Sequence, residues 1–220
     1  RRQLAFSYTE LGWLLSDTGR LRESEAAHRQ AVAHSAHLLE LLPEDPTNRR
    51  SFTRSINSLG DSLKDLARYD EARDAYEQGV SIADDLVHDF PGNLEYRSAL
   101  ASGLRDLAAL LTREDPVQGE SLLLRAATLS EALSREFPNV PSYRHNLADV
   151  YATLGNILRK TDRLQSAKQF HRVSMTMWEK LAADYPLVMD YKASLGRAYN
   201  NWGNQLRQEN RLDDAEEYIQ

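Results

Sequence analysis

The sequence lacks cysteine, has few residues that break secondary structure, and has no long apolar run. A 220-residue chain without cysteine cannot form a disulfide framework, a thiolate metal site or a cysteine nucleophile. The 10 glycines and 7 prolines disfavour extended β structure and low-complexity linkers. No apolar stretch approaches the roughly 18 residues of a membrane span. These absences fit a reducing compartment and a segment outside the membrane, so we expect a cytoplasmic location.

Basic residues are also in deficit. The chain has 27 lysines and arginines against 33 acidic residues, a formal charge of −6. Nucleic-acid binding rests on neutralising phosphates with positive charge, so this balance disfavours a general nucleic-acid partner. With 41% hydrophobic and 27% charged residues, the composition is that of a folded globular chain. A local basic groove remains compatible with it.

Prolines reveal an internal repeat. Pro43, Pro91, Pro138 and Pro186 lie 48, 47 and 48 residues apart. A Leu-Gly pair recurs in the same frame, with Leu-Ala in the third repeat and Trp-Gly in the fifth. The small residues of these pairs define position zero: Gly12, Gly60, Ala108, Gly155 and Gly203. Such a period is the signature of a repeat architecture.

An apolar stripe precedes and follows each small residue. Positions −8, −4, −1 and +3 are apolar in all five repeats, as in Phe52, Ile56, Leu59 and Leu63. Steps of four, three and four trace one face of an α-helix and do not fit the alternation of a strand. We name this first helix of each repeat helix A.

A second helix, helix B, is predicted after a short turn. In the second repeat its apolar residues include Ala72, Tyr76, Ala83 and Leu86. The turns before helix B contain residues that tolerate a left-handed backbone, such as Gly19 and Asp162, and Ala67 takes this place in the second repeat. The prolines separate helix B from the next helix A.

The pattern Ile56-x2-Leu59-Gly60-x2-Leu63, Ala72-x3-Tyr76 and Pro91 resembles the tetratricopeptide repeat (TPR) family. The fourth repeat has Tyr151-x2-Leu154-Gly155-x2-Leu158, Ala167-x3-His171 and Pro186. The resemblance extends over essentially the whole chain. It implies an all-α, right-handed α-solenoid of antiparallel helix pairs.

The repeat is 48 residues long where 34 are usual in the family. Both extra segments fall on the side of the proline loop, so each helix gains about two turns, or roughly 10 Å. We expect a single array over residues 1–220, with repeats at about 1–43, 44–91, 92–138, 139–186 and a truncated 187–220. The chain opens and closes inside a repeat. We therefore expect a fragment whose ends expose apolar edges that could associate with each other.

Residues that recur in every repeat are expected to build the array, because one ligand needs no copy in each unit. Tyr96, Tyr143 and Tyr191 each follow a proline by five residues, and a basic residue such as Arg49 or Arg144 accompanies this position. A row of tyrosines and bases could bind phosphate, but packing and solvation of a helix end are the favoured reading.

The resemblance implies that helix A lines a concave groove through positions −6, −3, +1, +4 and +5. In the first repeat these are Phe6, Thr9, Trp13, Ser16 and Asp17, and in the second Arg54, Asn57, Asp61, Lys64 and Asp65. Over five repeats the row carries eight basic and four acidic residues. Our candidate partner-binding residues are Arg105, Arg113, Asn156, Arg159, Lys160, Arg197, Asn200, Asn204 and Arg207. Arginine and asparagine donate to carboxylates, which favours an acidic peptide or a chain-terminal carboxylate.

Some members of the family hold a C-terminal carboxylate with lysine and asparagine at fixed groove positions. Asn156 and Asn201 match two of the amide positions, but Ala152 replaces the first lysine. The match to this clamp is therefore incomplete.

Signals for catalysis are weak. No Gly-rich phosphate loop, nucleophile elbow or zincin motif occurs. His34 and His37 lie one helical turn apart, but no third metal ligand follows at a matching spacing. We therefore expect no enzyme activity, no cofactor and no metal.

The leading interpretation is a non-catalytic scaffold that binds a protein or peptide in the helix-A groove. The alternative is a regulatory, partner-recruiting arm of a larger bacterial signalling enzyme, because similar long arrays occur beside eukaryotic-like Ser/Thr kinase domains. RNA reading by helical repeats is disfavoured by the acidic total and by the lack of a code of one base per repeat.

Overall fold

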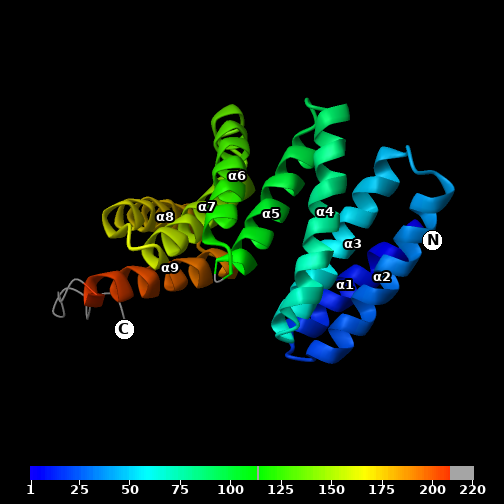
Figure 1. The fold of residues 1–220 in the computed structure, drawn as a ribbon, viewed down its shortest axis with the longest axis horizontal. Coiled ribbons are helices and arrows are strands. Elements are labelled where there is room, and N and C mark those ends of the chain that lie inside the picture. The colour runs from blue at the N-terminus through cyan, green and yellow to red at the C-terminus, as the bar shows by residue number, and fades with distance from the viewer. Residues whose placement is uncertain (113, 209–220) are drawn as a thin grey trace. The chain divides into compact units, whose positions relative to one another are not determined.

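The computed structural model describes residues 1–112 and 114–208, and all regular secondary structure in this part of the chain is α-helical (Figure 1). The described helices are α1 (Arg2–Asp17), α2 (Leu21–Leu41), α3 (Pro46–Asp65), α4 (Tyr69–Asp89), α5 (Leu94–Leu111), α6 (Pro116–Glu136), α7 (Pro141–Lys160), α8 (Leu164–Asp184) and α9 (Met189–Gln208). Odd-numbered helices are the predicted A helices and even-numbered ones the predicted B helices.

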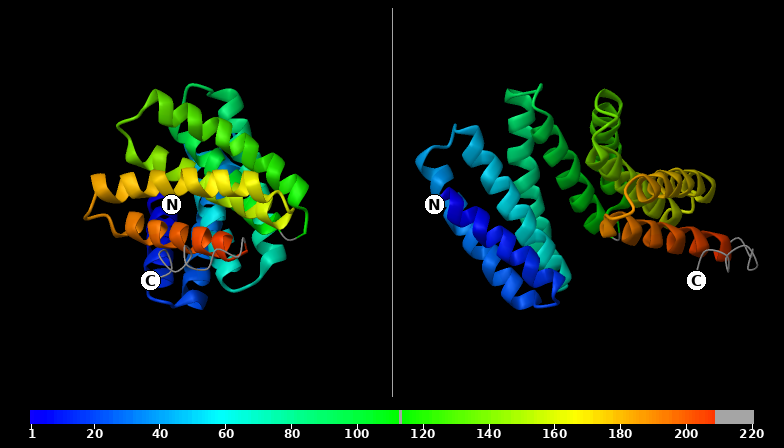
Figure 2. Two further views of the ribbon diagram at one scale, coloured as in Figure 1. Left: turned by 90° about the vertical axis from the view of Figure 1, so that its left-hand side faces the viewer. Right: turned by 180° about the vertical axis from the view of Figure 1, so that it is seen from behind.

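Successive helices form antiparallel hairpins, which pair α1 with α2, α3 with α4, and α7 with α8 (Figures 1 and 2). The three turns inside these hairpins each contain one residue with positive φ: Gly19 at 75°, Ala67 at 59° and Asp162 at 57°. The predicted left-handed turn is confirmed at all three places. The fifth repeat has Asn210 at the equivalent place, where the sequence predicts the same turn, and this residue lies outside the described residues.

Helix starts after the loops use proline and a capping side chain. Pro46 opens α3, and the Asp45 carboxylate accepts hydrogen bonds from the backbone N–H groups of Thr47 and Asn48. In the irregular third repeat, Pro116 opens α6 and Asp115 accepts from the N–H of Gln118. Proline lacks a donor that would be unpaired in the first turn anyway, so these helices begin at little cost.

The chain divides into two compact units, residues 1–110 and 111–220. In the first unit, the stripe of α3 is fully inside: Phe52, Ile56, Leu59 and Leu63 are all buried. The equivalent stripe of α5 is buried as well, through Leu100, Leu104 and Leu107. Helix α3 packs against α2, α4 and α1, so it buries small polar residues such as Ser55, Ser58 and Ser62 as well as its apolar stripe.

In the described part of the second unit, Trp178 of α8 lies at the centre of an aromatic core. It is 1% exposed and clusters with Leu181 of α8, Ala198 and Trp202 of α9, and Ala148 of α7. Helix α8 packs against both α7 and α9, so one large ring fills the space among three helices.

The stripe of α1 is an exception. Leu4 and Leu11 are 49% and 44% exposed, although their counterparts Phe52 and Leu59 are buried. In α3 these positions lie on a helix that packs against the preceding helix α2. The apolar edge expected at this end is therefore present.

No described helix is both long enough and apolar enough to cross a membrane.

Candidate partner-binding surface

Tyrosines after the proline loops pack against the end of the preceding repeat. The ring of Tyr96 lies edge-on to Phe90, with centroids 5.9 Å apart, and Tyr143 lies edge-on to Phe137 at 6.2 Å. Each aromatic pair closes the loop between a helix B and the next helix A. The interpretation that these tyrosines build the array is confirmed.

The accompanying arginines also serve the fold. Arg49 donates to Asp89 at 2.6 Å, and Arg144 donates to Asp184 at 3.4 Å, across the same separation of 40 residues. Each pair ties the start of a helix A to the end of helix B in the same repeat, where a cation would also meet the negative end of the helix dipole. These two arginines therefore stabilise the ends of the helix pair, as the favoured interpretation of the row expects.

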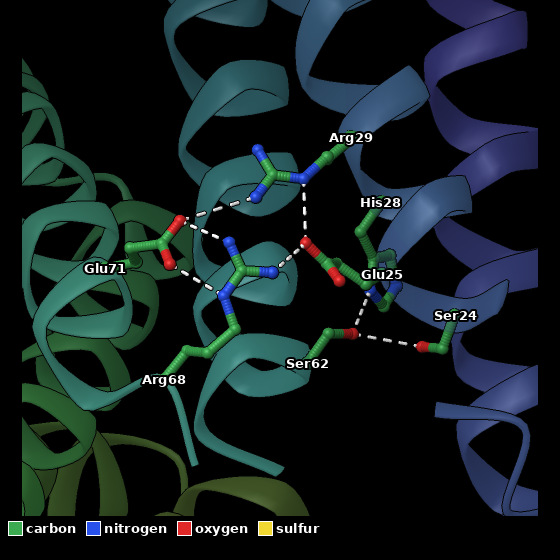
Figure 3. Close-up of polar contacts among 7 residues, drawn as sticks. All are labelled: Ser24, Glu25, His28, Arg29, Ser62, Arg68 and Glu71. Atoms are coloured by element: carbon green, nitrogen blue, oxygen red, sulfur yellow. Dashed lines mark hydrogen bonds and ion pairs between the residues drawn. The ribbon is translucent and has the colours of Figure 1, made fainter. Parts of the chain in front are cut away.

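Four charged side chains close a ring over α2 and α4 (Figure 3). Glu25 accepts from Arg29 at 2.8 Å and from Arg68 at 2.5 Å. Glu71 approaches the same two guanidiniums, at 3.5 Å from Arg29 and 2.5 Å from Arg68. Alternating charges in a closed network tie neighbouring B helices together more firmly than isolated surface pairs do.

The turn arginine repeats this role in the second unit. Arg163 donates to Glu120 at 2.5 and 2.8 Å, across 43 residues, the same separation as between Arg68 and Glu25. These contacts are architecture as well.

A buried polar chain lies beside the charged ring (Figure 3). The Ser62 hydroxyl is 3.0 Å from the Ser24 hydroxyl and 2.8 Å from Nδ1 of His28. Nε2 of His28 is 3.3 Å from the backbone oxygen of Thr9. Burial lowers the pKa of His28, so the neutral imidazole joins α1, α2 and α3 through both ring nitrogens.

The glycine at position zero leaves room for a ring from helix B. A Cβ atom placed on these glycines would lie 2.2 to 2.7 Å from that ring. The pairs are Gly12 with His28, Gly60 with Tyr76, and Gly155 with His171. Helices A and B therefore approach each other closely at this glycine, because a flat side chain lies on a backbone that carries no side chain.

Against this structural background, the helix-A face of the first unit carries a hollow of about 160 Å³ between α1 and α3. Two facing stripes line it: Arg2, Phe6 and Thr9 of α1, and Thr47, Arg50, Ser51, Arg54 and Ser55 of α3. Steps of three and four residues keep each stripe on one face of its helix. The lining thus contains three arginines, four hydroxyl side chains and one aromatic ring, with no acidic residue.

Arg54 is held in place by aromatic rings. Its guanidinium carbon lies 4.9 Å from the centroid of Phe6 and 4.7 Å from that of Trp13. Its Nη2 donates to Glu10 at 2.5 Å, and Trp13 Nε1 donates to the Ser58 hydroxyl at 3.2 Å. Phe6 remains 53% exposed, so an apolar surface stays open beside a positioned cation.

The other two arginines have partners outside the lining. Arg2 donates to the amide oxygen of Asn48 at 2.8 Å and lies 3.5 Å from the Asp45 carboxylate. Arg50 pairs with Glu95 of α5. Both arginine side chains are about half exposed, which makes these pairs weak and exchangeable.

Further along the same face, charged groups of α3, α4 and α5 form a cluster. The Tyr76 hydroxyl donates to Asp61 at 2.6 Å, and Lys64 donates to the same carboxylate at 3.0 Å. Burial opposes the charge on Lys64, but Asp61 and Asp106 hold its pKa above the usual value. Burial raises the pKa of Asp106, and the Arg105 guanidinium, 2.8 Å away, offsets part of that rise.

The predicted groove residues fall in different places. Arg105 lies in the first unit and is bonded to Asp106. Arg113 lies outside the described residues. The others are in the second unit: Asn156, Arg159 and Lys160 at the end of α7, and Arg197, Asn200, Asn204 and Arg207 on α9.

The α9 residues follow steps of three, four and three, so they share one face, and all four are exposed. Arg197 donates to the Ser194 hydroxyl at 2.7 Å. On α7, Lys160 is exposed, and Arg159 lies near the buried His171, whose pKa it helps to lower.

Sequence reasoning missed Arg2, Arg50 and the serines of α3. Arg2 and Arg50 both stand at position −10, one helical turn before Phe6 and Arg54 at −6. This row continues the stripe toward the helix start, and its spacing could have shown it. Ser51 and Ser55 of α3 line the hollow together with residues of α1, and the sequence alone does not show that these two helices lie side by side.

The described residues contain no group of three or more His, Asp or Glu side chains placed to hold a metal ion. The ring of His34 stacks on Tyr8 with ring centroids 5.6 Å apart.

Repeated antiparallel helix pairs, joined by contacts that recur from repeat to repeat, define an α-helical repeat protein. The tetratricopeptide repeat family profiles match residues 5–46, 53–86 and 143–183. The chain belongs to the tetratricopeptide repeat family. Repeats of this family generally mediate protein–protein interaction, and their fold is generally a non-catalytic scaffold.

Solved structures share the fold over nearly the whole chain. BtubC (BKLC) from P. vanneervenii is 18% identical to this chain, with a TM-score of 0.70. The superposition covers 99% of this chain and 78% of the BtubC chain. The apo form of RapI is 11% identical with a TM-score of 0.64, covering 100% and 81%. A putative kinesin light chain from Podosopora anserina with nearly identical TPR-like repeats is 18% identical with a TM-score of 0.61, covering 100% and 93%.

At these identities the likeness concerns the fold, and it confirms the all-α helical-repeat solenoid class. A search of curated proteins by sequence finds no match.

Proposed function

We propose that this chain is a non-catalytic interaction module that binds an acidic segment of a partner protein along its helix-A surface. The observation that carries the proposal is the hollow between α1 and α3. Its lining holds three guanidinium groups and no carboxylate, in a chain whose net charge is −6. Guanidinium groups are thus gathered where an extended segment could lie, and their present carboxylate partners lie outside the lining.

The chemistry of arginine supports an acidic ligand. A guanidinium presents a planar set of donors that matches the two oxygens of a carboxylate. Arg54 already lies between two aromatic rings, so little side-chain freedom is lost when a ligand binds. The exposed ring of Phe6 offers apolar contact to a neighbouring ligand residue.

The α9 face of the second unit is proposed as a further contact region. Arg197, Asn200, Asn204 and Arg207 are exposed along one side of that helix, and Arg159 and Lys160 add charge at the end of α7. Amides and guanidiniums in a row can donate to a peptide carboxylate or to backbone oxygens. This region is treated as independent of the hollow in the experiment below.

Fluorescence anisotropy with three labelled peptide libraries tests the proposal. The libraries are acidic, neutral and basic, with otherwise equal composition. Arg50→Glu with Arg54→Glu changes the hollow, and Arg159→Glu with Arg197→Glu changes the second region. Arg22→Glu with Arg172→Glu is the matched control, because these exposed arginines lie on the B helices α2 and α8.

We expect the acidic library to bind best to the unmodified chain, with an affinity that falls as salt rises. The hollow variant should lose at least about tenfold in affinity, which corresponds to about 1.4 kcal/mol. The control variant should lose much less, although its net charge is the same. Equal losses in the hollow and control variants would reduce the effect to general electrostatics and contradict the proposal.

A further inference from the structure

Each arginine of the hollow already lies close to one carboxylate, and these carboxylates belong to residues outside the lining. Arg54 is bonded to Glu10, Arg50 to Glu95, and Arg2 lies near Asp45. A single incoming carboxylate would exchange one such partner for another of equal charge. The arginines gain more from a ligand that carries a higher charge and offers more acceptor oxygens.

A phosphate ester has these properties. It carries about −1.5 to −2 charges near neutral pH and three strong acceptor oxygens. Three guanidiniums can share those oxygens without competing for one lone pair, and clustered arginines are a recurring means of recognising phosphorylated peptides. Among the hydroxyl side chains of the lining, Thr9 donates to the Ala5 carbonyl at 3.0 Å, whereas Ser51 is a small group that can also donate to the ligand.

Size and position agree with this ligand. The hollow of about 160 Å³ has the volume of roughly five water molecules. Phe6 provides an apolar wall for the carbon atoms of the esterified side chain.

We propose that the hollow between α1 and α3 receives a phosphorylated serine or threonine side chain of the partner segment. This inference rests on the proposed function, since it names the residue that the acidic segment presents to Arg50 and Arg54. Binding is reversible and involves no covalent step.

Three fluorescein-labelled peptide libraries provide the probe. They share degenerate flanking positions and carry serine, glutamate or phosphoserine at the centre. We expect the phosphoserine library to bind the unmodified chain at least about tenfold more tightly than the glutamate library, because charge-assisted hydrogen bonds to phosphate outnumber those to one carboxylate. Inorganic phosphate should compete with it.

Three variants locate the effect. Arg50→Gln and Arg54→Gln should each reduce the phosphoserine preference severalfold, whereas Arg22→Gln on α2 should leave it unchanged. Glu10→Gln should strengthen phosphoserine binding, because it removes the carboxylate that competes for Arg54. Circular dichroism melts of every variant confirm that the array remains folded.

The pH dependence gives a second readout. The second pKa of a phosphate ester is near 6, so lowering the pH from about 7.5 to about 5.5 should weaken phosphoserine binding. Glutamate stays ionised over this range, and its library should change less.

The outcomes separate the two proposals. Equal affinity for phosphoserine and glutamate, with both lost in Arg54→Gln, overturns the phosphate inference and leaves the acidic-segment proposal standing. Binding that none of the arginine variants weakens overturns both. Tighter binding of a single-stranded RNA of matched charge than of the phosphoserine library would also overturn the inference, because it would identify a nucleic-acid phosphate as the preferred ligand.

Discussion

Two histidines occupy the same position in their repeats but have different surroundings. His28 and His171 both lie on the position-zero glycine of their repeat. His28 has the Ser62 hydroxyl and the Thr9 carbonyl as partners, whereas neither ring nitrogen of His171 has a hydrogen-bond partner among the described residues. A buried polar group without a partner costs stability.

The His171→Phe variant is predicted to be as stable as the unmodified chain or more stable at neutral pH. Burial, with a contribution from Arg159, lowers the pKa of His171 to about 4 from an ordinary value of 6.5. The unfolded chain therefore takes up a proton first as the pH falls, and stability is lost between about pH 6.5 and 4. This histidine contributes about 3 kcal/mol to that loss. Urea melts at several pH values should show a smaller loss in the variant.

His28→Phe is the matched comparison. It removes both hydrogen bonds and leaves the Ser24 and Ser62 hydroxyls buried without the imidazole, so we expect a loss of about 1–3 kcal/mol. If both substitutions changed the free energy of unfolding equally, the difference between the two environments would have no energetic consequence.

Ala67 adopts a left-handed backbone conformation that alanine disfavours. Its φ is 59° and its side chain is exposed. Ala67→Gly should relieve about 1–2 kcal/mol of backbone strain and lose part of this gain to chain entropy, leaving a net stabilisation of about 0.5–1 kcal/mol. Thermal melts measure the change. Ala33→Gly, on the exposed face of α2, should instead destabilise the chain by about 1 kcal/mol.

At the scale of the element, the helix pair depends on a close approach between helix A and helix B. The predicted lengthening of both helices by the same amount is consistent with the observed pairs, in which α3 has 20 residues and α4 has 21. The hairpin stays in register because the ring of helix B fits over the glycine of helix A. A side chain at that glycine has no space.

Gly155→Leu should therefore destabilise the second unit by about 1–3 kcal/mol or more, because its Cβ would lie 2.7 Å from the His171 ring. Gly196→Leu is a control of the same chemistry, since, its own helix aside, none of residues 1–112 and 114–208 has an atom within 4 Å of the Cβ position at Gly196. It should be neutral or slightly stabilising, through better helix propensity. Chemical denaturation of both variants gives the comparison. Similar midpoints would show that Gly155 is not confined as described.

At the scale of the whole molecule, the fold class could be predicted because periodicity is visible in one dimension. The proline spacing, the apolar stripes and the turn residues each occur several times, so chance matches average out. The functional surface occurs once. The hollow joins α1 to α3, and its charge depends on which acids pair with Arg2, Arg50 and Arg54, information that no spacing displays.

The predicted groove residues were chosen from positions that the family resemblance implies, and these begin at −6. These positions include Phe6 and Arg54 at −6, but they do not include Arg50 at −10. The charge count then drew attention to the later repeats, where basic residues outnumber acids along the sequence. The hollow in the first unit forms because α1 and α3 enclose it, and a count of charged residues along the sequence does not show that enclosure.

Chemical-shift mapping by NMR shows directly whether the partner segment binds in the hollow between α1 and α3. Isotope-labelled chain is titrated with the phosphoserine library or, if the libraries bind equally, with the acidic one. We expect the largest amide shifts within residues 2–13 of α1 and 47–58 of α3. Shifts confined to the B helices α2 and α4, with those two segments unchanged, would contradict it.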